Sequence, residues 1–475
     1  MTTWRTSPTW VCRTVEQLAG EGYPSPATAP GITRGHIMRR AIAAVVAAGL
    51  LVAGSQLFQN LTSTTERAPV QVLAQTARSP QLAEVDRLIS VFEKRAEDFG
   101  DPLDLRELGN LHLERAELVG DLADYGAAID SLGMAVDLAP EDRAARIQLA
   151  RASLAVHRFD DALGIAEELI ESDPTDAAAQ LVVADAQFEL GDDEAAAESL
   201  DEVAALTGEI PEILTRRAQH ADSMGDVPGA LGYAEEALRI TDTDDAAPRR
   251  LAFHLAFVAH FLNDLGRYDE AEALSRRAIE TDPSWSSSHT ILGSVLLNDG
   301  RLEPAFSAYE DAASLRPDPG TLAMLGDLSV ALGDEERAEA FYQQVEPAAT
   351  GTPVHETAYR RVMAQFLADH DLDPDRAVAL AAADVAERSD PFGLDTYAWT
   401  LYKADRVDEA RALIEKVLAV GLREPQILYH SGLIALAEGD ESRARAELSE
   451  ALELAPRFHP LQAPHARSVL ESLGA

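Results

Sequence analysis

Residues 283–317 read PSWSSSHTILGSVLLNDGRLEPAFSAYEDAASLRP, and this stretch decides the fold. Apolar residues three and four positions apart line one face of a helix, and they occur here both before and after Gly300. Glycine accepts the left-handed conformation that closes a helix, and a proline such as Pro317 cannot extend one. The stretch therefore predicts two helices joined by a turn at Gly300 and ended by Pro317.

The same punctuation recurs with a period of thirty-four residues. Pro140, Pro174 and Gly208 stand thirty-four residues apart, as do Pro283 and Pro317. The stretch that ends at Pro456 repeats the whole pattern, with Gly432, Gly439, Ala444, Leu448 and Ala451. A fixed period of this length predicts one helical pair copied along the chain, so that each unit packs on its neighbours as in a solenoid.

The order of Leu-Gly in the first helix, Ala-x-x-x-aromatic in the second helix and a terminal proline resembles the tetratricopeptide repeat (TPR). The resemblance implies an all-α, right-handed α-solenoid of about ten TPR-like helix-turn-helix units over residues 103–456. The first unit has about seven extra residues between its helices. Only a small residue leaves room where helices cross closely, so Gly293 and Ala305 are assigned to such crossings.

The two ends of a solenoid need polar covers. Residues 81–102 carry apolar Leu82, Val85, Leu88 and Phe92 at helical spacing, which predicts an amphipathic N-terminal capping helix. Residues 457–475 are predicted to form a C-terminal capping segment with a short closing helix.

An apolar run precedes the repeats. Residues 41–58 read AIAAVVAAGLLVAGSQLF and follow Arg34, Arg39 and Arg40. Eighteen helical residues rise roughly 27 Å, close to the ~30 Å of a hydrocarbon core. The positive-inside rule then places the N-terminus in the cytoplasm and the repeats on the extracytoplasmic side. We expect residues 38–58 to be a single-pass transmembrane anchor, with a disordered segment at 1–37 and a linker at 59–80.

A second interpretation starts translation at Met38. Met38-Arg39-Arg40 followed by a short apolar stretch is typical of a secretory signal, and Val52-Ala53-Gly54 is then a cleavage site. In that case residues 1–37 are not translated and the repeats are secreted or periplasmic after cleavage. The apolar run continues past this site to Phe58, which favours the retained anchor.

The composition limits the partners. The chain has 475 residues and a formal net charge of −41. Phosphate binding needs a basic face, so nucleic acid is not expected as a partner. The acidity has two explanations, a solvated and self-repelling surface that reflects habitat or an acidic groove for a basic protein segment. Cys12 is the only cysteine, so the chain forms no intrachain disulfide and no Cys-based metal site.

The sequence offers no catalytic motif. It lacks a phosphate loop, a nucleophile elbow, a His-Glu-x-x-His pair and a dinucleotide fingerprint. Asp371-Leu372-Asp373-Pro374-Asp375 resembles the start of a calcium loop, but Arg376 and Ala382 replace the required glycine and glutamate. These aspartates are explained as caps of the helix that follows. We therefore expect no enzyme activity, no metal, no cofactor and no small-molecule substrate.

In the tetratricopeptide family, the first helices of successive units line a concave groove that holds a peptide or a partner helix. By register, the resemblance places on this inner face Phe253, His260, Asn263, Trp399, Tyr402, Lys403 and Tyr429. Aromatic residues with polar tips suit an interface, although Trp399 and Tyr402 equally suit packing between helices. Asp185, also in register, would repel a peptide C-terminus, which argues against a carboxylate clamp.

Two functions remain open from the sequence. One is a non-catalytic, membrane-tethered scaffold that presents its groove to a protein or peptide partner. The alternative is an accessory or regulatory subunit of an envelope enzyme or transporter complex.

Overall fold

The computed structural model describes residues 80–474 apart from 121, 244, 351–352 and 389, and its regular structure over this range is entirely helical. The predicted segment 1–37, the membrane helix 38–58 and residues 59–79 of the linker lie outside the described residues. None of the described helices is long and apolar enough to span a membrane.

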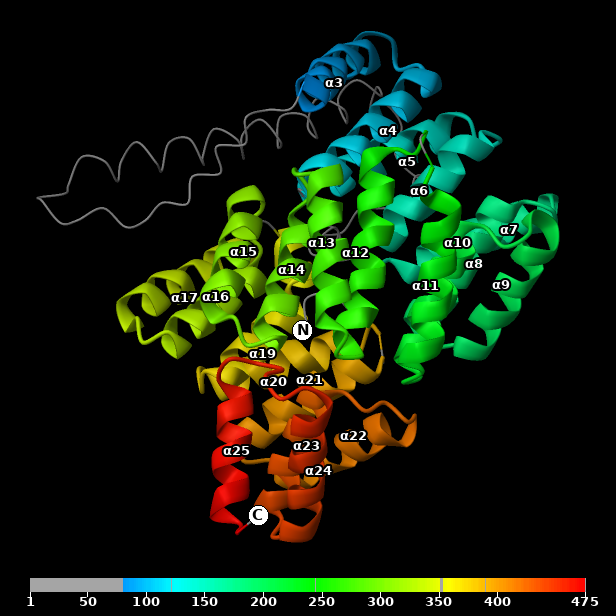
Figure 1. Cartoon of the computed structure of the whole chain (residues 1–475). Helices are drawn as coiled ribbons and strands as arrows, with labels where there is room; N and C mark the ends of the chain where they lie inside the picture. Colours follow the sequence, from blue (N-terminus) through cyan, green and yellow to red (C-terminus); the bar gives the residue numbers. More distant parts are fainter. Residues whose placement is uncertain (1–79, 121, 244, 351–352, 389, 475) are drawn as a thin grey trace, which may run out of the picture.

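The helices form consecutive antiparallel pairs, and Figure 1 shows them following one another from α3 at one end to α25 at the other. The pairs are α4 (Pro102–Val119) with α5 (Leu122–Leu138), α6 (Arg143–Ala155) with α7 (Phe159–Ser172), α8 (Ala177–Leu190) with α9 (Asp193–Thr207), α10 (Pro211–Ser223) with α11 (Val227–Thr241), α12 (Pro248–Asp264) with α13 (Tyr268–Thr281), α14 (Ser286–Asn298) with α15 (Leu302–Leu315), α16 (Pro319–Ala331) with α17 (Glu335–Ala349), α19 (Arg360–Asp369) with α20 (Pro374–Val385), α21 (Pro391–Lys403) with α22 (Val407–Ala419), and α23 (Pro425–Ala437) with α24 (Glu441–Leu454). A short helix, α18 (Pro353–Ala358), precedes α19.

The pair α14 and α15 shows why the repeat uses small residues. A Cβ atom on Gly293 would lie 2.7 Å from the ring of Tyr309, and Ala305 is fully buried between the two helices. Gly300 closes α14 with a φ of 86°, in the left-handed region that favours glycine. The crossing and the turn predicted from residues 283–317 are therefore confirmed.

The first pair differs from the prediction. The sequence suggests about seven extra residues between its helices, but α4 ends at Val119 and α5 begins at Leu122. The extra residues lengthen both helices instead. No proline interrupts α4 after its first residue, so this helix continues to Gly120, whose φ of 69° ends it.

Both ends of the array are covered by helices. Helix α3 (Pro80–Phe99) packs on α4 and buries Val85 and Ile89. Helix α25 (Gln462–Ser472) packs on α23 and α24 and buries Ala463 and Ala466. These apolar contacts replace the neighbouring unit that each terminal pair lacks.

The array curves until its distant parts touch. Gly120 lies against the side chain of Arg316, and Gly225 lies against the carbonyl oxygen of Gly421. In both contacts the two residues are 196 positions apart in the sequence. This spacing is a little under six periods of thirty-four. One apolar cluster likewise joins Leu132 of α5 to residues of α14, α16 and α19. The inner face of the solenoid is therefore partly closed by contacts of the chain with itself.

Candidate functional site

The inner-face residues predicted from the sequence form two groups. Trp399, Tyr402 and Lys403 of α21 lie together with Tyr429 of α23. The ring centroid of Trp399 is 5.1 Å from that of Tyr402 and 5.8 Å from that of Tyr429. Lys403 Nζ lies 5.3 Å from the Trp399 centroid. The three other residues, Phe253, His260 and Asn263, all belong to α12.

The first group is largely covered by the C-terminal segment. Trp399 and Tyr429 are buried, and the Tyr429 hydroxyl is 2.8 Å from His465 Nδ1 of α25. Phe458 packs its ring 5.9 Å from that of Tyr429. The expectation that Trp399 and Tyr429 are open to a ligand is therefore wrong, because the capping segment folds over Tyr429 and the ring of Trp399 stacks on His430 with centroids 4.2 Å apart. Tyr402 and Lys403 stay partly exposed, and a binding role for them remains a prediction.

Two residues of the second group pack between neighbouring units. His260 and Asn263 are buried. The Asn263 side chain donates to Ser294 Oγ at 3.4 Å and accepts from Asn298 Nδ2 at 3.0 Å. Their predicted exposure on the groove is wrong, because Asn263 is enclosed between α12 and α14, and His260 is buried with its Nε2 atom 3.5 Å from Asp264. Phe253, about two helical turns before His260, is partly exposed.

Phe253 borders an open hollow on the first helices α8, α10 and α12. We call this site the inner hollow, and its cavity volume is about 330 Å³. Its lining includes Leu154, Asp185, Phe188, Ala197, Leu200, Glu212, Arg216, Gln219, His220, Arg250, Phe253 and His254. The hollow thus lies on the helices that the tetratricopeptide resemblance assigns to the concave groove.

The repeat period itself could have identified most of this lining. Asp185, Gln219 and Phe253 stand thirty-four residues apart, as do His220 and His254. Equivalent positions of successive units face the same side of a solenoid. The sequence pointed to Phe253 and Asp185, whereas Gln219, His220 and His254 were missed although they stand in the same periodic positions.

Ion pairs neutralise most charges around the inner hollow. Arg216 pairs with Asp185 across α10 and α8, and Arg250 lies 3.6 Å from Glu212. A third carboxylate, that of Glu189, is 3.5 Å from Arg388 Nη1. Burial raises the pKa of Glu189, and the charge of Arg388 opposes that rise. A ligand in the hollow therefore meets paired rather than isolated charges.

Two histidines of the hollow, His220 and His254, have an Nδ1 atom without a hydrogen-bond partner, and His254 is the more deeply buried. Its side chain is buried, and Nδ1 has no hydrogen-bond partner. Burial, together with the positive charge of Arg250, lowers the pKa of His254 to about 4. The imidazole is consequently neutral at neutral pH and can serve as a hydrogen-bonding group.

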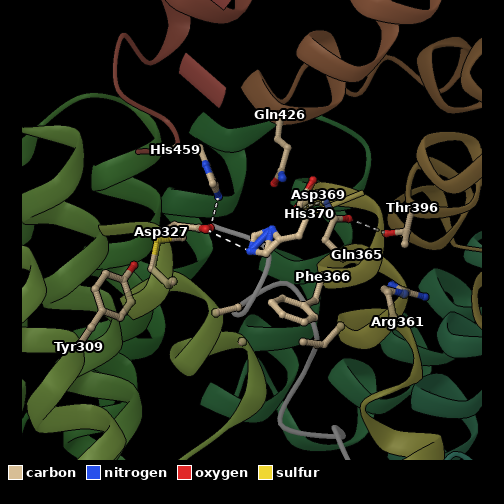
Figure 2. A pocket seen from close by; sticks show the side chains of 14 residues that line it. Tyr309, Asp327, Arg361, Gln365, Phe366, Asp369, His370, Thr396, Gln426 and His459 are labelled. Atoms are coloured by element: carbon tan, nitrogen blue, oxygen red, sulfur yellow. Dashed lines mark hydrogen bonds and ion pairs between the residues drawn. The ribbon is translucent and has the colours of Figure 1, made fainter. Parts of the chain in front are cut away.

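A second, smaller cavity of about 60 Å³ lies between α16, α19, α21 and α23. Figure 2 shows His370 and His459 both pointing at the buried carboxylate of Asp327. Their Nε2 atoms are 3.3 and 3.2 Å from its oxygens, and the Tyr342 hydroxyl donates to it at 2.7 Å. His459 Nδ1 accepts from the backbone of Leu461 and Gln462, so its Nε2 is the protonated nitrogen when the ring is neutral.

This second cavity is a docking point for the C-terminal segment. His459 precedes α25 and contacts Asp327 of α16, while Gln462 of α25 donates to Asp369 Oδ1 of α19 at 3.0 Å. The polar groups of the cavity thus hold the capping segment against units that lie more than ninety residues earlier in the chain.

Within the described part of the chain, no group of three or more His, Cys, Asp or Glu side chains could hold a metal ion. Asp373 accepts from the backbone N–H of Arg376 at 3.2 Å, and Asp371 pairs with Lys403 at 2.5 Å. Asp373 therefore caps α20 as the sequence predicted, and the ion pair of Asp371 with Lys403 is an addition that the sequence did not indicate.

The family model described as "Tetratricopeptide repeat" matches residues 147–211, 262–321 and 398–457. The chain is a tetratricopeptide repeat protein. The matched segments cover helical pairs of the solenoid, including the first half of the inner hollow. No curated protein matches the sequence.

Several solved structures resemble this TPR protein. Human IFIT1, in a dimer with PPP-AAAA, is 16% identical with a TM-score of 0.43, over 81% of this chain and 93% of that chain. Yeast Tom70 is 15% identical with a TM-score of 0.30, over 78% and 95%. PilW, a type IV pilus biogenesis factor, is 20% identical with a TM-score of 0.37, over 45% and 96%. At these values nothing about a ligand follows for this protein.

Proposed function

We propose that this protein is a non-catalytic scaffold that binds a segment of a partner protein in the inner hollow. The observation that carries the proposal is the open volume of about 330 Å³ on the first helices of three consecutive units. Small concave sites with apolar walls and a few polar groups are the usual form of a binding site. Here the walls include Leu154, Phe188, Leu200 and Phe253.

The charge of the chain favours a protein partner over nucleic acid. A net charge of −41 repels phosphate groups and attracts basic segments. At the rim, the side chains of Glu212 and Arg250 are 44% and 52% exposed, so both are available for exchange with a partner's charges. We therefore infer a partner whose bound segment carries basic residues beside an apolar anchor.

Peptide selection on the full-length chain tests this proposal. Peptides selected by phage display are measured against wild type, Ala197→Trp and Ala205→Trp. Ala197 lines the hollow, whereas Ala205 lies exposed on the same helix, α9. We expect Ala197→Trp to fill the hollow and weaken binding by at least about tenfold, because the anchor can no longer enter. Peptides that bind both variants equally would place the binding surface elsewhere.

We also propose that residues 38–58 tether the repeats to a membrane, with the repeats on the extracytoplasmic side. The support is the apolar run at 41–58 and the arginines before it. Protease treatment of sealed membrane vesicles and of opened vesicles tests this topology. N-terminal sequencing of the mature chain separates a retained anchor from a cleaved signal, since a chain starting near Ser55 would indicate cleavage.

A further inference from the structure

We infer that one edge of the first helical pair is a second interaction surface, which binds an amphipathic segment of a partner protein with basic residues beside an apolar face. The surface consists of Phe99 at the end of α3, Leu103 in the first turn of α4, and Leu138 at the end of α5. We call these three residues the end patch. It is separate from the inner hollow, whose lining begins at Leu154 of α6.

The end patch exposes large apolar side chains to an unusual degree. Phe99 is 77% exposed and Leu103 is 57% exposed, the two highest values among the large apolar side chains of the described residues. Leu138 is 41% exposed. Single exposed apolar residues are common on protein surfaces, whereas several together mark a contact surface.

Buried neighbours bring the end patch together. One apolar cluster joins the ends of α3 and α5 to the start of α4, and it includes Ala96, Leu105 and Ala135. Each of these lies two or three positions from an end-patch residue. The Arg106 guanidinium donates to Asp142 at 2.7 Å and so ties the start of α4 to the turn after α5. Figure 1 shows α3, α4 and α5 together at one end of the array, so the end patch occupies a single edge.

Unpaired negative charge surrounds the end patch. The exposed carboxylates within four residues of it are Glu97, Asp98, Asp101, Glu107, Asp137 and Glu141. None of them forms an ion pair within the described residues. The arginines over the same range are paired, since Arg95 lies 2.7 Å from Asp104 and Arg106 pairs with Asp142, and Lys94 adds one positive charge just beyond it. The surface is therefore an apolar centre inside a negative rim.

This negative rim decides between the possible occupants. In a symmetric dimer the same patch would meet itself, so the two rims would repel each other. The anionic headgroups of a lipid surface would be repelled in the same way. A protein segment with lysine or arginine beside apolar side chains pairs with the rim while it covers the centre.

The test uses a labelled helical peptide with leucines on one face and lysines on the other. Its affinity for the full-length chain is measured by fluorescence anisotropy, with and without Leu103→Ser, and every chain also carries Ala197→Trp to fill the inner hollow. The matched control is Leu454→Ser, because Leu454 is 44% exposed beside Glu453 at the end of α24. We expect Leu103→Ser to weaken binding about tenfold, the factor for losing a buried leucine contact, and Leu454→Ser to leave it unchanged. Replacing Glu97→Gln together with Asp98→Asn should weaken binding and reduce its salt dependence.

Equal affinities of Leu103→Ser and Leu454→Ser would overturn the inference. Both leucines are exposed, so neither substitution is expected to disturb the fold. Photocrosslinking from p-benzoylphenylalanine at position 103 identifies the occupant directly. A crosslink to the added peptide supports the inference. A crosslink to lipid, to a second copy of the chain or to residues 1–79 in its place rejects it, because something else then covers the end patch. The proposed function is unaffected by either result, since the hollow is filled in every chain of this test.

Discussion

Gly326→Ala tests the physical reason for glycine at helix crossings. Gly326 of α16 faces Tyr342 of α17, and an added Cβ atom would lie 2.1 Å from Cε1 of that ring. Ordinary contact begins near 3.4 Å, so the ring must move by more than 1 Å. The Tyr342 hydroxyl donates to the buried carboxylate of Asp327 at 2.7 Å, and this movement breaks that bond.

The magnitude follows from three contributions. Overpacking a crossing costs about 1–3 kcal/mol, and losing a hydrogen bond to a carboxylate costs about 1.5–3 kcal/mol. Alanine stabilises a helix interior by about 1 kcal/mol relative to glycine. We therefore expect Gly326→Ala to lower the free energy of unfolding by about 3 kcal/mol.

The matched control is Gly164→Ala in α7. No atom lies within 4 Å of the Cβ position at Gly164, so only the helix-propensity gain remains. We expect this variant to gain about 0.5–1 kcal/mol. The two substitutions are chemically identical, and the structure predicts opposite signs for them.

Urea unfolding followed by circular dichroism measures both variants. A long repeat array need not unfold in one step, so hydrogen exchange with mass spectrometry locates the change. Faster exchange in α16, α17 and α19 is expected for Gly326→Ala. A Gly326→Ala protein as stable as Gly164→Ala would refute the crossing geometry.

Three further predictions concern the buried groups His254 and Asp390 and the contact between Gly225 and Gly421. Burial and the charge of Arg250 lower the pKa of His254 to about 4, so its contribution to the free energy of unfolding is fully present above pH 6.5. About 3 kcal/mol of that contribution is lost as the pH falls to 4. Urea titrations should show this loss in wild type and not in His254→Leu. Burial alone would raise the pKa of Asp390, but Arg361 and Arg388 lower it to about 2, so this group loses about 2 kcal/mol between pH 4 and 2. In Asp390→Asn the unfolding free energy should fall by about 2 kcal/mol less than in wild type over that interval. Gly225→Ala places a Cβ atom 2.9 Å from the carbonyl oxygen of Gly421 at a φ of 81°, so the free energy of unfolding should fall by about 1–3 kcal/mol. Small-angle scattering should show a larger radius of gyration for this variant. An unchanged radius would contradict the contact between Gly225 and Gly421.

Each repeat carries the information for its own packing. Gly293, Ala305 and Tyr309 could be assigned from spacing, since their partners lie within the same unit, and Gly300 from the turn that it closes. The capping helix α3 was predictable for the same reason, because its apolar face is continuous in the sequence. Contacts at short sequence separation repeat with the period and can be read from it.

The candidate site was only partly predictable. The register correctly puts Phe253 on the inner face, and the same register brings His220 and His254 to the hollow. It cannot show that Tyr429 is covered, because the covering residues, Phe458 and His465, lie outside the repeats. Nor can it show that Nδ1 of His254 lacks a partner, since that depends on every neighbour of the ring.

The sequence by itself therefore determined the helical pair, its period and the residues that pack within it. Only the tertiary structure decided where the solenoid closes and where it stays open. The physical reason is that each unit is rotated slightly relative to the one before it, and these rotations add up over nearly six units before Gly225 contacts Gly421. No single repeat encodes that sum, and the inner hollow lies on α8, α10 and α12 beside one such long-range contact, between Glu189 and Arg388.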